Sequence, residues 1–300
     1  MPSYATHHIF AATVQRVTGD SVARIAAAYP AGYRWGAQGP EPLCLYHAPF
    51  PSQMRRLAQR MRTEPPAPLF EALCDAAVRE HNTAALAYVF GFCTNYALDR
   101  VTHAFIGAQA DRLALYVPGY SVEARRKLAE SDIDGIMIAG FIAAEPAKFE
   151  AYRLLDPNAA ECTVLSRVVS SAAKSVYGMR VPPAAVYHSL HDMRRILHLT
   201  HSGSLARGRL QWVERLFGKA GQASSLIRPA EPLAADCANE EHRPWLSDGV
   251  ERTDSFCDLF DAAVPLAVSL QRAVLDRYYQ QKPLDPRFFP TDFTGSVAKS

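Results

Sequence analysis

Polar side chains that could bind a metal ion or an anion recur along one face of the helix predicted around residue 99. Asn95, Asp99 and His103 stand at i, i+4 and i+8, and at about 100° per residue they lie within about 80° of one another on that face. Carboxylate and imidazole groups at this spacing can reach one metal ion together. The spacing also suits a solvated stripe with intrahelical pairs, and for the triplet alone this structural interpretation is favoured.

A second triplet repeats the spacing with Arg126, Glu130 and Asp134. Ser121 follows a Pro-Gly pair and is a good N-cap, which predicts a helix over Val122 to Phe141. The sequence therefore predicts two helices, each offering several ionisable groups from one face.

Segments of distinctive sequence follow one another in a fixed order along the chain. They are THHIFA (6–11), QGPEPL (38–43), GFCTNYALDRVTHAFI (91–106), RKLAESDID (126–134), ANEEHRPW (238–245) and SFCDLFDAAV (255–264). This order resembles the bacterial zinc-dependent phospholipase C family over roughly residues 3–280, with YALDRVTHAFI and ANEEHRPW as the most specific pieces. The resemblance implies a single all-α, multi-helix domain of the phospholipase C/P1-nuclease type over residues 1–280, followed by a Pro-rich and aromatic tail over 281–300.

The resemblance also implies a zinc site. In that family a zinc cluster among helices polarises a phosphodiester while a metal-bound hydroxide attacks phosphorus. The positions that match the family's metal ligands are His7, Glu41, Asp99, His103 and Glu130. By the same match Asp99, Glu41 and Glu130 would serve catalysis, with Glu130 acting as a ligand or as a base.

Three positions where the family has histidine carry other residues, namely Arg62, Asn95 and Arg126. Arginine cannot bind zinc, and the neutral amide of asparagine is a weaker ligand than imidazole. Guanidinium groups do bind phosphate well, so the three residues are also candidates for anion binding.

Three interpretations of this substituted site remain open. The two arginines could pair with Glu41, Asp99 and Glu130 as salt bridges, they could capture a phosphate ester without metal, or His7, Asp99 and His103 could form a reduced metal site. The expected function is that of a divergent phosphoric ester hydrolase with reduced or lost activity, holding fewer than three zinc ions or none. The alternative is a non-catalytic helical protein that binds a phosphorylated ligand, such as a phospholipid head group, or a protein partner.

Composition excludes several other classes. The 300 residues are 49% hydrophobic, enough for a substantial core, and 32 basic against 30 acidic residues give no field that would favour nucleic acid. The start of the chain lacks signal-peptide features and the apolar run Gly135 to Ala144 is too short to span a bilayer, so a cytoplasmic protein without a membrane span is expected. The six cysteines form no CxxC pair and are expected to be reduced.

Helical periodicity dominates and no convincing alternating strand is present. The apolar runs with helical spacing are Ile9 to Val17, Leu69 to Val78, Ala84 to Ile106, Cys162 to Val176, Val186 to Leu199 and Phe256 to Tyr279. Ala84 to Ile106 is expected to be the central buried helix. Pro and Gly clusters separate the runs, at 30–32, 39–42, 49–51, 65–68, 118–119, 182–183 and 229–244.

Other features have mainly structural interpretations. The histidines at 188, 191, 198 and 201 could hold a metal but more commonly form a solvent-facing stripe. Trp212 and Trp245 are expected to anchor packing between helices, and Asn239 to Trp245 to fix the last helix against the body. The tail after Gln281 suits an extended strap on the body or a frayed end.

Overall fold

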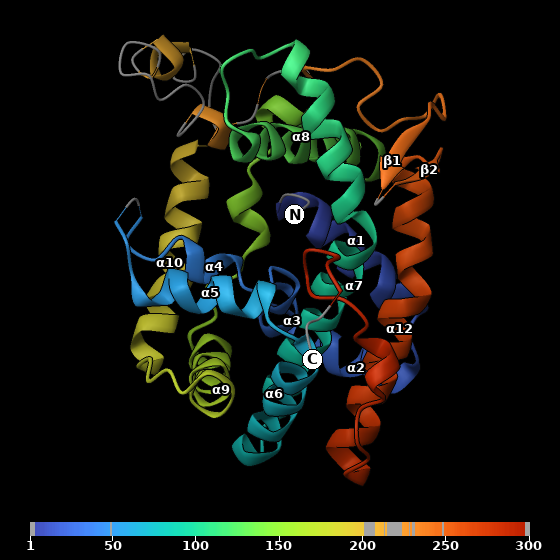
Figure 1. Ribbon diagram of the computed structural model, residues 1–300. Coiled ribbons are helices and arrows are strands. Elements are labelled where there is room, and N and C mark those ends of the chain that lie inside the picture. The colour runs from blue at the N-terminus through green and yellow to red at the C-terminus, as the bar shows by residue number, and fades with distance from the viewer. Residues whose placement is uncertain are drawn as a thin grey trace.

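The chain is almost entirely helical in the computed structural model, which describes residues 4–48, 50–200, 208–212, 214, 224–227, 229, 232–247 and 249–297. Figure 1 shows the helices surrounding a central one, and the only sheet in the described ranges is a short hairpin. The all-α class predicted from apolar periodicity is therefore confirmed. Among the described residues no helix is both long and apolar enough to cross a membrane.

Every apolar run identified in the sequence forms a helix, with ends extended by a few residues. These helices are α1 (Tyr4–Val17), α6 (Pro66–Glu80), α7 (Thr83–Arg112), α9 (Ala159–Tyr177), α10 (Pro183–Thr200) and α12 (Phe256–Gln280), and the helix predicted after Ser121 is α8 (Val122–Met137). Single turns of 3-10 helix connect some of them, at η1 (Leu113–Leu115), η3 (Pro146–Lys148), η4 (Ala151–Leu154), η5 (Ser224–Leu226) and η6 (Pro286–Phe288). The Ser121 side chain accepts a hydrogen bond from the backbone N–H of Ala124, as an N-cap should. The end predicted at Phe141 differs, because Ile138–Ile142 (η2) is a turn of π-helix.

Shorter helices near the N-terminus were not predicted. They are α2 (Asp20–Ala28), α3 (Pro30–Ala37), α4 (Glu41–Cys44) and α5 (Gln53–Thr63), and α3 and α4 overlap the Pro and Gly breaks at 30–32 and 39–42. Pro30 opens α3 at a position where a missing N–H costs nothing. The proline therefore marked a helix start rather than a loop.

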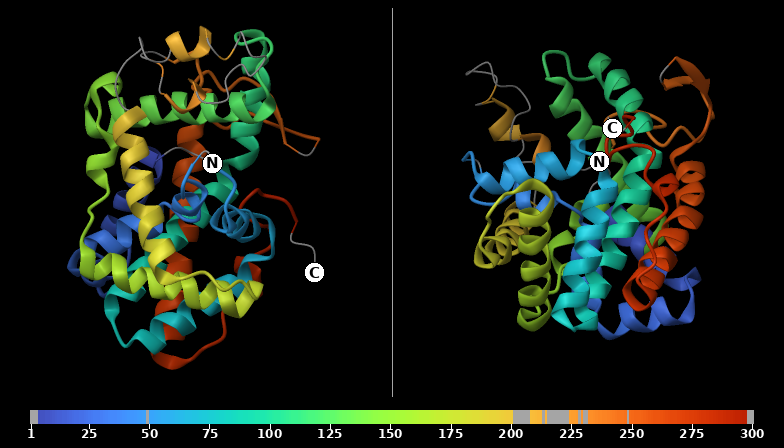
Figure 2. Two further views of the ribbon diagram at one scale, coloured as in Figure 1. Left: turned by 90° about the vertical axis from the view of Figure 1, so that its left-hand side faces the viewer. Right: turned by 60° about the horizontal axis from the view of Figure 1, so that its bottom comes forward.

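Helix α7 is the central element, as predicted for Ala84 to Ile106. Its residues from 84 to 99 are all buried, because α1, α2, α3, α6, α8, α9 and α12 contact it from different sides. On the side of the molecule away from α12, α9 and α10 pack against each other (Figure 1, Figure 2). A helix covered on all sides must be apolar all round, so any polar residue buried on α7 needs a specific explanation.

Helices α3 and α7 cross at van der Waals contact between two glycines. A Cβ on Gly36 would lie 2.0 Å from the carbonyl oxygen of Tyr88, and a Cβ on Gly91 would lie 2.0 Å from that of Tyr33. Only glycine fits at either position. This close crossing brings the end of α3 and the following turn against the middle of α7.

Buried carboxylates hold the N-termini of two helices in place. Asp134 of α8 accepts hydrogen bonds from the backbone N–H of Thr6 at 2.8 Å and of Ala5 at 3.2 Å, and from the Thr6 hydroxyl at 2.6 Å. Glu161 of α9 accepts one from the N–H of Gly32 at 2.7 Å. The first N–H groups of a helix have no partner within it, so an acidic side chain there stabilises both groups.

The tail follows the first of its two predicted alternatives, a strap packed on the body. Phe289 and Phe293 are buried against the rings of Phe70 and Tyr96. The Tyr96 hydroxyl also donates a hydrogen bond to the carbonyl oxygen of Thr291 at 2.7 Å. The tail therefore contributes Leu284, Phe289 and Phe293 to the hydrophobic core.

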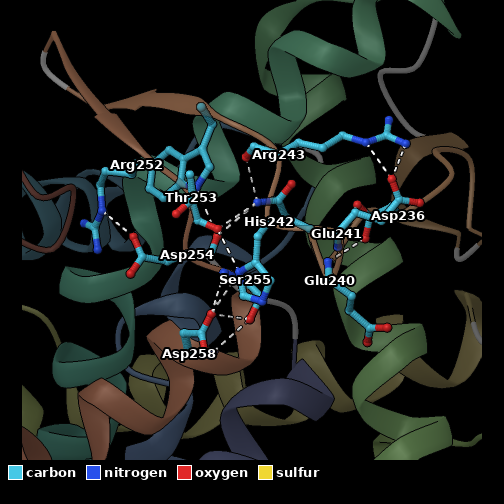
Figure 3. A network of polar contacts seen from close by, with 12 residues as sticks. Asp236, Glu240, Glu241, His242, Arg243, Arg252, Thr253, Asp254, Ser255 and Asp258 are labelled. Carbon is cyan, nitrogen blue, oxygen red and sulfur yellow. Dashed lines mark hydrogen bonds and ion pairs between the residues drawn. The ribbon is translucent and has the colours of Figure 1, made fainter.

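The segment from Asp236 to Asp258 fixes the start of α12 (Figure 3). The buried Asn239 side chain donates hydrogen bonds through Nδ2 to the carbonyl oxygens of Arg243, Thr253 and Asp254, at 2.9, 3.3 and 3.2 Å. Ser255 and Asp258 then form a capping box at the first turn of α12. The structural interpretation of Asn239 to Trp245 is confirmed.

Two details of this part of the chain differ from expectation. β1 (Trp245–Ser247) pairs with β2 (Val250–Arg252) in a small antiparallel hairpin, although no strand was predicted. Trp245 is buried at 5% exposure and packs edge-on against Phe105, as expected, but Trp212 is 65% exposed. The prediction that Trp212 anchors packing within the chain is wrong.

Candidate functional site

A buried polar contact joins α1 to the middle of α7. His7 is 2% exposed and Asp99 is fully buried, with His7 Nε2 lying 3.3 Å from Asp99 Oδ1. The Asn95 amide, one turn before Asp99, lies 3.3 Å from His7 Nδ1 and donates a hydrogen bond to the carbonyl oxygen of Ala37 at 3.1 Å. The same amide nitrogen also lies 3.4 Å from His7 Nε2, so Asn95 contacts both ring nitrogens of His7.

The turn after α3 is shaped around Asn95. Gly39 has φ +56°, and a Cβ at this position would lie 2.1 Å from Asn95 Oδ1. Glycine is required here both by its left-handed backbone and by the close approach of the amide. The same turn leads directly into Glu41 at the start of α4.

Glu41 pairs with Arg62 of α5. An Nη2 hydrogen of Arg62 is donated to Glu41 Oε2, and about a quarter of each side chain is exposed (25% and 22%). Burial lowers the pKa of Arg62, while Asp99 and Glu130 raise it by their negative charge. Arg62 is therefore held among three carboxylates and stays protonated.

His103 pairs with Arg126 of α8. Arg126 donates from Nη2 to His103 Nε2 at 2.6 Å and to the carbonyl oxygen of His103 at 3.2 Å. The pKa of His103 is lowered to about 3 by burial first and then by the charge of Arg126, so the imidazole is neutral near pH 7. Its Nε2 lone pair, the atom available for a metal, is already used by a guanidinium.

Glu130 lies in the same region, one turn after Arg126. Its charge acts on Arg62, and it also raises the pKa of Tyr4, for which burial is the larger cause. The structure thus brings together all eight residues singled out in the sequence, in three linked contacts plus Glu130. These are His7, Asn95 and Asp99; Glu41 and Arg62; and His103 and Arg126. We call these eight residues, together with Gln38, the polar cluster.

Several buried atoms of the polar cluster make no hydrogen bond in the part of the chain that the structure describes. They are Gln38 Oε1, Arg62 Nε, Asn95 Oδ1, Asp99 Oδ1, Asp99 Oδ2 and His103 Nδ1. The His7 Nε2 to Asp99 Oδ1 distance is short, but the pair is not aligned as a hydrogen bond. Buried polar atoms normally find partners, so this concentration requires an explanation such as bound water or a ligand.

The donor set does not fit a zinc site as it is placed. Over the described residues no group of three or more His, Cys, Asp or Glu side chains is arranged to hold a metal ion. Within the polar cluster Arg62 occupies the carboxylate of Glu41, and Arg126 occupies Nε2 of His103. A fixed positive charge beside each of these ligands opposes a divalent cation.

The rival histidine stripe on α10 has the structural character expected of it. His188 and His198 are exposed, and the rings of His191 and His198 pack against Tyr187 and Tyr152. His201 lies outside the described residues.

Sequence reasoning missed some residues that shape the cluster. Gly39 was interpreted as part of a Gly-Pro break, and Gln38 was named only within the QGPEPL segment beside Glu41. Asp134 was noted as the third member of the α8 triplet, and its role is to hold the start of α1, which carries His7. The i, i+4, i+8 spacing was the signal for Asp134, but spacing alone does not show which partner a carboxylate faces.

Comparison with protein-family models, with curated proteins and with solved structures finds no match for this chain.

Proposed function

We propose that this chain is a divergent phospholipase C-like protein, of the phospholipase C/P1-nuclease type of fold, whose polar cluster binds a phosphate ester without catalysing its hydrolysis. The supporting observation is the contact between Arg126 and His103. The imidazole of His103 is neutral, so it orients the Arg126 guanidinium without offsetting its positive charge. The proposed location is the cytoplasm, as the sequence predicts.

The two arginines differ in what they can offer an anion. Arg62 is paired with Glu41 and feels the charges of Asp99 and Glu130, so its charge is already balanced. Arg126 makes no ion pair with a carboxylate among the described residues, and both of its hydrogen bonds run through Nη2. Its Nε and Nη1 hydrogens therefore suit a phosphate or a phospholipid head group.

The competing function is the family's own chemistry at reduced strength, with zinc on His7, Asp99 and His103 and a bound hydroxide as nucleophile. Occupation of His103 Nε2 and of Glu41 by guanidinium groups argues against it. Elemental analysis of protein purified without chelator or nickel resin separates the two functions. Near-stoichiometric zinc supports the hydrolase, and its absence supports the binding protein.

Binding is tested by titrating the protein with phosphocholine in an isothermal titration calorimeter. We expect Arg126→Ala to weaken binding about tenfold, in keeping with loss of a charge-assisted bidentate contact worth about 1.5 to 3 kcal/mol. Lys127→Ala is the matched control, because Lys127 carries the same charge on the same helix and pairs with Glu123. Equal weakening in both variants would reduce the effect to general electrostatics and contradict a site at Arg126.

The relation to the zinc enzymes is tested by restoring the three histidines. We expect phosphodiesterase activity on a soluble choline-phosphate ester to be near background in the parent chain. The triple variant with Arg62→His, Asn95→His and Arg126→His should take up more zinc than the parent. Each single variant should take up less zinc than the triple, because one change removes a counter-charge without completing the zinc coordination shell. A folded triple variant that binds zinc no more tightly than the parent would count against this ancestry.

A further inference from the structure

A pocket separate from the polar cluster lies between the end of α8 and the chain segment that precedes the Asn239 hydrogen bonds. Its volume is about 590 Å³, within the range of small-molecule sites. The lining residues are Ile136, Pro232, Ala234, Ala235, Asp236, Cys237, Ala238 and Glu240. None of them belongs to the polar cluster, and the proposed phosphate site does not use them.

The lining combines an apolar wall with two carboxylates. Ile136 and the alanines supply aliphatic surface, whereas Asp236 and Glu240 are the charged side chains of the pocket. The Asp236 carboxylate accepts hydrogen bonds from the backbone N–H groups of Glu240 at 2.6 Å and Glu241 at 3.3 Å, which hold it in place. Figure 3 shows the Glu240 side chain extending away from Thr253 and Asp254.

Among the described residues, Glu240 has no cation paired with it. It is exposed and forms no ion pair within the described ranges, while the nearest cation along the chain, Arg243, is paired with Glu241. A pocket whose own charges are all negative disfavours anions and attracts cations.

The carboxylates of the pocket also act on two nearby thiols. The pKa of Cys237 is raised to about 12, first by burial and then by the charges of Asp132, Asp236 and Glu240. The pKa of Cys257 on α12 is also raised, first by burial and then chiefly by Glu240. Glu240 therefore acts electrostatically on both the pocket wall and the neighbouring helix.

Hydrogen bonds hold part of the pocket wall before any ligand arrives. The carbonyl oxygen of Asp236 accepts a hydrogen bond from the N–H of Asn239 at 3.0 Å, and the N–H of Leu233, between Pro232 and Ala234, donates to Asp132 Oδ2 at 3.0 Å. A preformed site loses little conformational entropy on binding, so even modest contacts contribute to affinity.

We propose that this pocket binds a small organic cation, with its apolar body against Ile136, Ala234 and Ala235 and its ammonium group at Glu240 and Asp236. The apolar wall gives affinity through burial of hydrocarbon, and the carboxylates select the charge. A neutral molecule of the same shape gains only the first contribution, and an anion is repelled.

Three ligands of one shape test the proposal: cyclohexylmethylammonium, cyclohexylmethanol and cyclohexanecarboxylate, each titrated into the full chain and followed by chemical shifts of the protein. We expect the ammonium compound to bind about threefold or more tighter than the alcohol, the range expected for an ion pair between an ammonium group and an exposed carboxylate. Cyclohexanecarboxylate should bind most weakly. Raising the salt concentration should reduce the difference in affinity between the ammonium compound and the alcohol.

Two variants locate the site. Glu240→Gln should reduce the preference for the ammonium compound over the alcohol, while Glu251→Gln, an exposed glutamate of β2 outside the pocket, should leave it unchanged. Ala235→Leu fills the pocket from an exposed position and should abolish binding of both compounds without loss of the fold, as checked by thermal unfolding. Equal affinity for cation and alcohol, or binding that survives Ala235→Leu, would overturn the proposal.

Discussion

The polar cluster on α7 and the Asn239 segment are both polar regions beside the core, yet they treat their buried polar atoms in opposite ways. Asn239 is fully buried and its amide donates to carbonyl oxygens of three residues, with no unsatisfied side-chain atom over residues 236–247 and 249–258. Asp99 is equally buried, but both of its carboxylate oxygens lack a hydrogen bond. The two regions therefore differ in whether their buried polar atoms have hydrogen-bond partners, and not in how deeply those atoms are buried.

The difference separates a region arranged for stability from one that is not. Hydrogen-bonded polar groups at Asn239 join the hairpin to α12, and removing them would leave several carbonyl oxygens without partners. Unsatisfied polar groups at Asp99, Asn95 and His103 make the fold less stable than apolar residues would. Proteins retain such groups chiefly where they serve function, which supports a binding role for the polar cluster.

The largest effect is expected at Asn239. Asn239→Ala should lower the free energy of unfolding by about 3 kcal/mol, because it leaves the carbonyl oxygens of Arg243, Thr253 and Asp254 without their donor. Urea denaturation followed by circular dichroism measures this loss. Asn239→Gly serves as a control for the backbone, since glycine tolerates the φ of +56° while lacking the side chain. If Asn239→Gly is as stable as the parent chain, the loss in Asn239→Ala comes from backbone strain and not from the missing hydrogen bonds.

The next largest effect is an acid sensitivity that belongs to the polar cluster. His103 has a pKa of about 3 in the fold against 6.5 when unfolded, so between these values the unfolded chain binds the extra proton. The stability that the neutral His103 contributes should be fully present above about pH 6.5 and be lost as the pH falls toward 3. We expect the free energy of unfolding to decrease by about 2 kcal/mol between pH 7 and pH 5 for this reason. Denaturation at these two pH values measures the slope.

His103→Gln should reduce that slope, because glutamine can accept the Arg126 hydrogen bond without titrating. His8 provides the comparison: its pKa is lowered to about 4, mainly by burial, so His8→Gln should reduce the slope in the same pH range. If His103→Gln leaves the slope unchanged while His8→Gln reduces it, the neutral state of His103 inferred from the Arg126 contact is wrong.

Apolar periodicity was enough to predict the long helices because each buries a continuous face, against α7 or, for α10, against α9. It did not identify α3, which starts in the Pro-Gly break at 30–32 and carries Gly36, the residue required for the close crossing with Gly91. That requirement depends on a contact between residues far apart in the chain, which no local pattern contains. The hairpin at Trp245 was missed for a similar reason, since its three-residue strands are too short to show alternation.

The polar cluster was predictable in membership but not in pairing. Spacing along α7 placed Asn95, Asp99 and His103 on one face, and the structure keeps them together. Which of them faces His7 and which faces Arg126 depends on how α1 and α8 pack on α7, and the sequence carries no local signal for that. The roles of these residues as metal ligands or anion-binding groups remain predictions.

The smallest effect expected is opposite in sign to that at Asn239, and it tests the contrast most directly. Asp99→Asn keeps the shape of the side chain and removes a buried charge whose oxygens make no hydrogen bond. Arg62, on which the charge of Asp99 acts, keeps its ion pair with Glu41 in this variant, so the free energy of unfolding should rise by about 1 kcal/mol. Asp134→Asn is the matched control: this equally buried carboxylate accepts three hydrogen bonds from Ala5 and Thr6, and its replacement should cost about 2 kcal/mol. If both variants lose stability to the same extent, the contact between His7 and Asp99 stabilises the fold as the Asn239 hydrogen bonds do, and the unsatisfied atoms no longer argue for a ligand.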